Sequence, residues 1–407
     1  MSNKEQTAKG VYQLDNGYWA YRFIIKVNGK NKAQKRVKDE LGNPFKTQKQ
    51  ALRARKAAIE KEKLNSLLPQ QQPTKKTFAE VYDEYCTNGR SGKAYSTIKK
   101  QDSLWKNHLQ KKFGDKYIEE ITVAEIQDYF EELYYKEKRA YSYVESFLKM
   151  FYLVFGQAYS RNYMNIDYYN KLCVNKDTKI HMPKLKIDDD LDIVYFTKEE
   201  ITQLEKYFRG KNAETAYMLG RYCGLRISEC FGLKWNNINI AESYIQIDRQ
   251  MQYQDGLIKL VSLKTRNAKR KVYMCDILRN YFIDLKRQQA TYVNIFKEQR
   301  QQNQTIIKDL DGSDLSSLEL VNTLPNGKLQ TVNSMKYHSR CIKEQFSIQF
   351  KYHYLRHTYG TYLAALNTPE YLLCNQMGHS SSNVTHKYYV AISDLGISVL
   401  KNNLELL

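Results

Sequence analysis

Two polar stretches break this 407-residue chain into three parts, and this division limits the possible folds more than any other feature. The first, LLPQQQPTKK at 67–76, contains two prolines and a glutamine run that interrupt helical and strand periodicity. The second, at 173–195, is polar and has no sustained period. Because the chain is also too long for one core, we expect three domains, at 1–66, 77–172 and 196–407.

The net charge indicates a polyanionic partner. Sixty-four Lys and Arg against 44 Asp and Glu give +20 and an isoelectric point near 9.3. A membrane is disfavoured because the basic residues are scattered and no run of about 18 apolar residues occurs. The start, MSNKEQTAKG, lacks the apolar segment of a signal peptide. We therefore expect a cytoplasmic protein that binds nucleic acid, with its seven dispersed cysteines reduced.

The first part of the chain is predicted to form a small three-stranded sheet followed by a helix. GYWAYRFIIKV (17–27) is rich in aromatic and β-branched residues, and Asn28–Gly29 is typical of a hairpin turn. The stretch 47–63 contains strong helix formers, with Thr47 as a plausible N-cap.

The same strands are strongly basic. Six basic residues and no acidic one lie from Lys26 to Lys38. Basic strands with aromatic residues suit insertion into a DNA groove, although a solvated, charged hairpin has the same composition. The candidates for DNA contact here are Tyr21, Arg22, Lys26, Lys30, Lys32, Lys35, Arg36 and Lys38.

Residues 77–172 are predicted to be helical. One buried helix face is indicated by the i, i+3, i+4, i+7 spacing of Phe78, Val81, Tyr82 and Tyr85. A capping box and a hydrophobic staple are predicted in ITVAEI, from Thr122 with Glu125 and Ile121 with Ile126. Lysines crowd one helical region, as either a solvated face or a phosphate-binding face; the candidates for DNA contact are Lys99 and Lys100.

The last part is predicted to be a mixed, predominantly helical α+β domain. FTKEEI opens a helix with Thr197 and Glu200 as a capping box, and a β-rich section at 243–275 is followed by helices. The long polar stretch 291–330 is predicted to be a helix extension and a loop.

CGLRISECFGLKW (223–235) is the first of four stretches that carry chemistry. Gly224 permits a sharp turn, Arg226 follows it, and Glu229 lies one helical turn later on the same face. A buried Arg–Glu ion pair would give the same pattern.

The second stretch is LVSLKTRNAKRKVYM (260–274). Two β-like runs flank a basic, turn-prone centre, which predicts a hairpin whose turn begins at Lys264. By itself this lysine fits a solvated loop equally well. The basic residues that follow are further candidates for DNA contact: Arg266, Lys269 and Arg270.

The third stretch, YHYLRHTYGTYL (352–363), concentrates cationic side chains on a helix. His353 and Arg356 are three residues apart and share a face, whereas His357 points elsewhere and is predicted to pack or cap. Such a concentration is costly in a core, so it favours an anion-binding role.

The fourth stretch is NTPEYLLCNQMGHSSSNVTHKYYV (367–390). Thr368 is predicted as an N-cap and Pro369 as the first helical residue, and Gly378 ends the helix. His379 follows this turn, and Tyr388 lies nine residues later.

These residue types suit phosphoryl transfer from a DNA diester. Arginine forks bind non-bridging phosphate oxygens. A phenol with a pKa of about 10 becomes a nucleophile beside cations that stabilise its phenolate. A lysine can protonate the departing 5′ oxygen. Since these cations would do what metal ions do in two-metal nucleases, and no carboxylate cluster is evident, we expect neither a metal nor a cofactor.

The order Arg…Lys…His-x-x-Arg…His…Tyr, with GLRISE, HYLRHT and MGHSSSNVTHKYY, resembles the tyrosine recombinases, or phage-type integrases. The catalytic resemblance covers 196–390. It implies a multidomain α+β protein in which 10–66 is similar to the arm-type DNA-binding domain of phage and conjugative-transposon integrases. The helical part 77–172 is similar to the core-binding domain of the family.

The resemblance also implies residue roles. Arg226 and Arg356 would clamp the scissile phosphate, and His353 would be a base or hydrogen-bond partner. Lys264 would protonate the leaving 5′ oxygen, and His379 would support the transition state. Glu229 would orient its neighbours.

In the family the nucleophile usually stands nine residues after the last histidine, which selects Tyr388 and leaves Tyr389 as a packing residue. Its attack would give a 3′-phosphotyrosyl link and a free 5′-OH. The resemblance implies a homo-tetramer on double-stranded DNA that integrates and excises a mobile element, with an excision factor or a DNA-bending protein as a further candidate partner. A tail helix over 390–407 is predicted to dock on a neighbouring protomer, with packing on its own domain as the alternative.

Three other functions share parts of the pattern. A type IB-like topoisomerase or a resolvase would use the same chemistry, but a separate arm-binding domain argues for integration. A catalytically silent DNA-binding regulator would not need all six catalytic candidates, which are Arg226, Lys264, His353, Arg356, His379 and Tyr388. A metal-dependent nuclease should show clustered Asp and Glu beside the histidines, which this sequence lacks.

Overall fold

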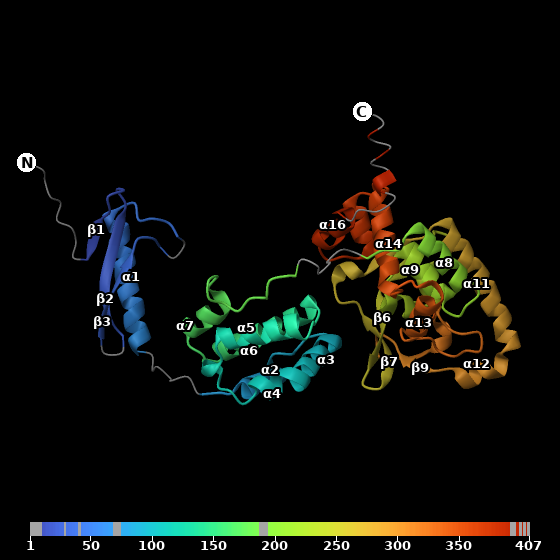
Figure 1. Cartoon of the computed structure of the whole chain (residues 1–407), viewed down its shortest axis with the longest axis horizontal. Coiled ribbons are helices and arrows are strands. Elements are labelled where there is room, and N and C mark those ends of the chain that lie inside the picture. Colours follow the sequence, from blue (N-terminus) through green and yellow to red (C-terminus); the bar gives the residue numbers. More distant parts are fainter. Residues whose placement is uncertain are drawn as a thin grey trace, which may run out of the picture. The chain divides into compact units, whose positions relative to one another are not determined.

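The structure, a computed structural model, describes residues 10–27, 30–39, 42–67, 75–186, 194–390 and 396–398, with Lys401 and Leu404. The chain divides into two units, Met1–Gly92 with Lys99–Lys184, and Lys93–Ile98 with Leu185–Leu407. Figure 1 labels the helices and strands along the chain. The predicted tail helix lies mostly outside the described residues. None of the helices that the structure describes has the length and apolar content of a membrane span.

The N-terminal part of the first unit is a three-stranded antiparallel sheet and one helix, as predicted. The sheet has the order β1 (Val11–Gln13), β2 (Trp19–Val27), β3 (Lys30–Arg36), and α1 (Gln48–Leu67) packs on one face. Alternate β2 residues, Trp19, Tyr21 and Phe23, are buried against α1. The backbone N–H of Gln50 donates to Thr47 Oγ1 at 3.3 Å, as predicted for the N-cap. The predicted turn at Asn28–Gly29 lies outside the described residues.

The rest of the first unit is helical. Phe78, Val81, Tyr82 and Tyr85 form the predicted buried face of its first helix. The helices are α2 (Phe78–Asn88), α3 (Tyr95–Leu104, whose first four residues fall in the second unit), α4 (Gln110–Phe113), α5 (Val123–Glu131), α6 (Tyr141–Ser160) and α7 (Ile166–Tyr169).

The capping box predicted at the start of α5 is only half formed. The backbone N–H of Glu125 donates to Thr122 Oγ1 at 3.2 Å, but the Glu125 carboxylate pairs with Lys116 and does not return to the cap. The ion pair with Lys116, which lies outside the ITVAEI motif, therefore takes the place of the second hydrogen bond of the capping box. Ile121 and Ile126, the predicted staple, are both fully buried.

The polar stretch after residue 172 begins as part of the helical unit. Ile180 is fully buried in the same hydrophobic cluster as the helices, and its N–H donates to the Leu172 carbonyl at 2.9 Å. The hydroxyl of Tyr152 donates to the Ile180 carbonyl at 2.5 Å. The boundaries of three separate domains stay a prediction.

The second unit is the predicted mixed, mainly helical α+β domain. Thr197 and Glu200 form the predicted capping box, with hydrogen bonds of 2.9 and 3.2 Å. Its helices are α8 (Lys198–Phe208), α9 (Glu214–Cys223), α10 (Ile227–Phe231), α11 (Asp276–Ile295), α12 (Lys297–Asn303), α13 (Ser334–Phe346), α14 (Tyr352–Ala365), α15 (Glu370–Met377) and α16 (Ser382–Val390).

Two small sheets lie in this unit, and they correct the predicted hairpin at 260–274. One has the order β4 (Ile238–Asn239), β5 (Tyr244–Ile247), β8 (Arg270–Tyr273); the other has the order β10 (Asp314–Ser316), β9 (Ile306–Lys308), β7 (Leu257–Ser262), β6 (Arg249–Gln254). The two runs flanking Lys264 are β7, which pairs with β6, and β8, which pairs with β5. The Lys264 segment therefore crosses from one sheet to the other.

The polar stretch 291–330 contains more structure than the predicted helix extension and loop. It supplies the end of α11, all of α12, and two short strands, of which β9 runs parallel to β7. The side chains of Ile307 on β9 and Leu315 on β10 are buried in the main hydrophobic core of this unit, so both strands pack against it. Asp309 pairs with Lys234 at 3.0 Å and with Arg249 at 2.6 Å.

Candidate active site

A sharp turn between α9 and α10 positions the first arginine. Gly224 takes up φ +59°, as the sequence predicted, and Arg226 immediately precedes α10. Arg226 Nη1 donates to Glu229 Oε1 at 2.7 Å, and its backbone N–H donates to Oε2 at 3.0 Å. The remaining amino group, Nη2, donates to the Gly378 carbonyl at 3.1 Å, so the turn after α15 also fixes this guanidinium.

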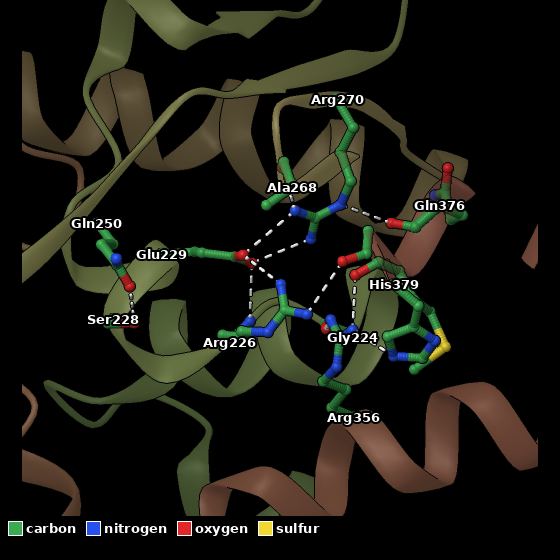
Figure 2. A network of polar contacts seen from close by, with 12 residues as sticks. Gly224, Arg226, Ser228, Glu229, Gln250, Ala268, Arg270, Arg356, Gln376 and His379 are labelled. Atoms are coloured by element: carbon green, nitrogen blue, oxygen red, sulfur yellow. Dashed lines mark hydrogen bonds and ion pairs between the residues drawn. The ribbon is translucent and has the colours of Figure 1, made fainter. Parts of the chain in front are cut away.

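Arg270, predicted to contact DNA, is instead buried beside the site, with 4% of its surface exposed. Its guanidinium donates to both carboxylate oxygens of Glu229, at 3.0 and 3.2 Å (Figure 2). It also donates to the carbonyls of Gln376 and Ala268, both at 2.9 Å. The DNA-contact prediction was wrong because the Arg270 guanidinium is neutralised by a buried ion pair with the Glu229 carboxylate. A signal was present: Arg270 and Val272 alternate along β8 and share its buried face.

The carboxylate of Glu229 is the charge partner of the arginines. Burial by itself would raise its pKa, but Arg270, then Arg226 and Arg356, outweigh burial and lower it. Glu229 is therefore an anion at neutral pH. It holds Arg226 in place, as predicted, and also Arg270.

The second arginine, Arg356, points from α14 into the same network and is 1% exposed. Its Nη1 donates to the Gly224 carbonyl and its Nη2 to the Met377 carbonyl, both at 2.6 Å. Burial, and then the charge of Arg226, lower its pKa to about 9, so it remains a cation at neutral pH. Two guanidinium groups from distant parts of the sequence thus lie against the same turns.

His379 stands directly after the turn that ends α15. Gly378 has φ +65°, and a Cβ there would lie 2.8 Å from Arg270 Cδ, so only glycine fits. Arg356 Nη2 lies 2.8 Å from His379 Nε2, and His379 Nδ1 lies 2.8 Å from Thr385 Oγ1. Burial, and then Arg356 and Arg226, lower the pKa of His379 to about 3. The neutral ring therefore accepts from Arg356 and donates Nδ1–H to Thr385.

Tyr388 is buried on α16 beside this network. It is 4% exposed, and its ring stacks on that of His379 with centroids 5.9 Å apart. Burial raises the pKa of Tyr388, and Arg356 and Arg226 oppose that effect without overcoming it. In this arrangement the phenol is neutral.

Tyr389, the neighbouring tyrosine, has a different environment. Its hydroxyl donates to the carbonyl of Thr368, and the half-buried side chain packs against the hydrophobic cluster of Ala364, Leu373, Met377 and Tyr388. Thr368 was predicted as the N-cap of α15, but the helix begins one residue later, with Pro369 at the cap position.

The two histidines of α14 lie against each other, with ring centroids 4.5 Å apart. His353 keeps access to solvent, yet partial desolvation of its ring lowers its pKa, and His357 and Arg356 act in the same direction. His357 Nδ1 lies 3.0 Å from the Val194 carbonyl, and its ring centroid lies 6.0 Å from that of Tyr388. His357 thus makes the packing contacts predicted for it.

Lys264 and residues of this cluster line one cavity of about 370 Å³. Lys264 is exposed and lines the cavity together with Arg226, Glu229, Gly378 and His379. The cavity thus adds an ammonium group to the cations of the site. Among the described residues, no three His, Cys, Asp or Glu side chains gather in a way that could hold a metal ion.

The remaining candidates for DNA contact differ in how exposed their side chains are. Tyr21 is buried beneath the sheet against Phe45, so its predicted role was wrong; alternation along β2 places it on the α1 face. The exposed candidates are Arg22, Lys35, Arg36, Lys38, Lys99, Lys100 and Lys269. The side chains of Lys26, Lys30, Lys32 and Arg266 lie outside the described part of the structure.

Comparison with known proteins gives two family matches. Residues 195–394 match the phage integrase family, and residues 77–134 match the SAM-like N-terminal domain of phage integrases. A tyrosine recombinase XerC-like protein of Caldanaerobacter subterraneus subsp. tengcongensis is 23% identical over 317 residues, which cover 74% of this chain and 76% of that protein.

Solved structures share the fold. The Tn1549 transposon integrase, solved in complex with transposon right-end DNA, has a TM-score of 0.62 at 17% identity and covers 81% of this chain and 100% of that chain. A lambda integrase tetramer bound to a Holliday junction has a TM-score of 0.51 at 14% identity, with 97% of each chain covered.

Proposed function

The chain belongs to the phage integrase family of tyrosine recombinases, and from this premise we propose that it cuts and rejoins DNA at specific sites through a 3′-phosphotyrosyl link to Tyr388. The observation that carries the proposal is the convergence of Arg226, Arg356, His379 and Tyr388. They come from four separate elements, and burial of the cationic side chain of Arg356 is costly unless it serves an anion-binding site.

The two arginines would hold the scissile phosphate. Their amino groups now donate to the carbonyls of Gly224, Met377 and Gly378. An incoming phosphate offers charged acceptors for the same donors, and charge-assisted bonds are the stronger ones. As the diester is attacked, negative charge grows on its non-bridging oxygens, so these bonds strengthen in the transition state.

In the cleavage step the Tyr388 oxygen attacks phosphorus and the bond from phosphorus to the 5′ oxygen breaks. The phenol is neutral at rest, so its proton needs an acceptor, and the neutral imidazole of His353 is the candidate base. The ammonium group of Lys264 would donate a proton to the departing 5′ oxygen. His379 would support the transition state by accepting from Arg356 and so holding that guanidinium in place, and Glu229 would keep Arg226 oriented.

Rejoining is the reverse reaction. A 5′-OH from a partner duplex attacks the phosphotyrosyl bond and releases Tyr388, so no external energy source is required. Exchange between two duplexes needs several active sites, and we propose a homo-tetramer that integrates and excises a mobile element. The transposon-end complex of the Tn1549 integrase and the lambda tetramer on a Holliday junction support this. An excision factor or a DNA-bending protein is the expected accessory partner.

A suicide substrate tests the proposal. A duplex nicked near the cleavage site loses the short 5′-OH fragment after attack, so the covalent protein–DNA adduct accumulates. We expect adduct in EDTA with the wild type and with Tyr389→Phe, and none with Tyr388→Phe. The reverse pattern would assign the nucleophile to Tyr389, and an adduct that requires added metal would overturn the mechanism.

A further inference from the structure

The segment that carries Lys264 is held by contacts at its two ends. The Lys264 side chain makes none of these contacts. The segment leaves β7 at Ser262 and enters β8 at Arg270. Lys264 is exposed, and among the described residues its ammonium group has no hydrogen-bond or ion-pair partner. The position of this group therefore depends on what holds the backbone on either side.

At the start of the segment, a buried glutamine bridges it to α10. Gln250 lies on β6 and is 8% exposed. Its Nε2 donates to the Ser262 carbonyl at 3.2 Å, and its Oε1 accepts from Ser228 Oγ at 3.1 Å. Ser228 lies on α10 between Arg226 and Glu229, and Figure 2 shows the Ser228–Gln250 bond beside the arginine network.

At the end of the segment, Arg270 makes the second connection to α10. It donates to the Ala268 carbonyl at 2.9 Å and to the Glu229 carboxylate. Both ends of the Lys264 segment are thus tied to the short helix that also orients Arg226. Gln250 and Lys264 line the same cavity of about 370 Å³.

We propose that Gln250 is a positioning residue for proton donation by Lys264, and that it acts by fixing Ser262 against Ser228. The inference rests on the proposed function, because it takes Lys264 as the group that protonates the departing 5′ oxygen. Proton transfer requires the ammonium group within hydrogen-bond reach of that oxygen. Without the Gln250 bond Ser262 is held by its pairing with Arg249 in the sheet but no longer tied to α10. This widens the range of positions the lysine visits, and a misplacement of about 1 Å can cost on the order of 10²-fold in rate.

Replacing the bridging 5′ oxygen with sulfur gives a test that distinguishes a role in proton donation from a general structural role. With this substrate Tyr388 forms the same bond to phosphorus, but the bond that breaks is phosphorus to sulfur. The sulfur departs as a thiolate, which carries the electron pair away and needs no proton. Cleavage of the sulfur substrate is thus independent of Lys264, while it still needs the arginines and Tyr388.

Cleavage rates would be measured under single-turnover conditions on both substrates. Lys264→Ala should lose about 10²–10⁴-fold on ordinary DNA and approach the wild-type rate on the sulfur substrate. Gln250→Met, which keeps the length of the side chain, should lose about 10–10²-fold on ordinary DNA and recover in the same way. Gln252→Met, the same change two residues along β6 and away from Ser262, should match the wild type on both substrates.

Three outcomes overturn a claim. If Lys264→Ala is not rescued by sulfur, the proposed role of Lys264 fails. If Lys264→Ala is rescued but Gln250→Met cleaves ordinary DNA like the wild type, or is equally slow on both substrates, the positioning role of Gln250 fails. Ser228→Ala breaks the same bridge from α10 and should reproduce the Gln250→Met pattern, which keeps the test valid if Gln250→Met reduces the yield of folded protein.

Discussion

The imidazole ring of His379 lies nearly parallel to the phenol ring of Tyr388, with 10° between their planes and 5.9 Å between their centroids. The two residues belong to different elements, the turn after α15 and helix α16. A hydrogen bond from His379 to Thr385 on α16 links the turn to the helix. Together with the packing of α16 on α14 and α15 and the Tyr389–Thr368 hydrogen bond, it orients the helix that carries the nucleophile.

Thr385→Val should slow cleavage by about 10-fold without weakening DNA binding. The change keeps the shape of the side chain but leaves His379 Nδ1–H unpaired in a buried place, at a cost of about 1–3 kcal/mol. The measurement is the single-turnover cleavage rate on a nicked site, with affinity measured separately. Thr385→Ser should retain the wild-type rate because it keeps the hydroxyl.

Thr361→Val is a matched control for that experiment. Thr361 is 1% exposed, and within the described residues its hydroxyl has no hydrogen-bond partner. The same loss of a hydroxyl there should leave cleavage unchanged. Equal rates for Thr385→Val and Thr385→Ser would show that the bond to His379 does not matter.

Glu229 and Arg270 should show strong energetic coupling. Both side chains are 1% exposed, and removing Glu229 leaves the Arg270 guanidinium buried without its charge partner, which costs about 3–5 kcal/mol. Removing Arg270 costs less, because the Glu229 carboxylate keeps its ion pair with Arg226. Glu229→Met with Arg270→Met should cost clearly less than the sum of the single changes. Urea unfolding of the four proteins in the cycle measures the coupling.

The exposed pair Lys308–Asp314 provides the comparison for this cycle. Its side chains are 47% and 63% exposed, and exposed ion pairs contribute about 0–1 kcal/mol. Coupling of Glu229 to Arg270 no larger than that of Lys308 to Asp314 would contradict a buried, mutually dependent pair.

His379 should make the stability of the catalytic unit depend on pH. In the unfolded chain an imidazole titrates near pH 6.5, whereas in the fold burial, then Arg356 and Arg226, lower the pKa of His379 to about 3. Between these values only the unfolded chain binds the proton, so stability rises with pH. The contribution of His379 is complete above pH 6.5 and is lost as pH falls toward 3.

The test compares wild type with His379→Gln in urea unfolding at pH 7 and pH 5. The wild type should lose up to about 2 kcal/mol more than the variant between these pH values. All other titrating groups are shared, so the difference isolates His379. The same pH dependence in both proteins would mean that His379 is not held neutral.

Much of the site could be predicted because its residues are spaced within single helices and turns. Arg226 with Glu229, and His353 with Arg356, follow helical geometry, and Gly224 and Gly378 supply left-handed turns that few other residues adopt. Local pattern was sufficient for these positions.

The wrong predictions concern residues and strands whose positions depend on contacts between distant parts of the sequence. Arg270 stands in a run of basic residues that looks solvated, and its partner Glu229 lies on another element. The strand after Lys264, β8, pairs with β5, and no local turn signal indicates that pairing. The strand before it, β7, pairs with β6 across Asp255–Gly256, a typical hairpin turn that the prediction left unused. At three residues each, β9 and β10 are too short for alternation to identify.

The outer face of the N-terminal sheet should bind DNA through its phosphates. Arg22 and Lys35 are directly paired across β2 and β3, both are exposed, and α1 covers the other face. Each phosphate contact that is lost lowers the salt dependence of binding by about 0.9 in log–log slope. Arg22→Ala with Lys35→Ala should therefore weaken binding to duplex DNA carrying the element's ends and reduce that slope by about 2.

The control removes the same charge from the helix. Lys49 and Arg53 are exposed on α1, so Lys49→Ala with Arg53→Ala changes the net charge equally without touching the sheet. If only total charge mattered, both double variants would shift the salt slope alike, because long-range attraction depends little on position. A slope that falls only for Arg22 and Lys35 assigns the contact to the sheet, whereas equal slopes would reject it. Cleavage of a short core site should be unchanged in both variants, since the active site lies in the other unit.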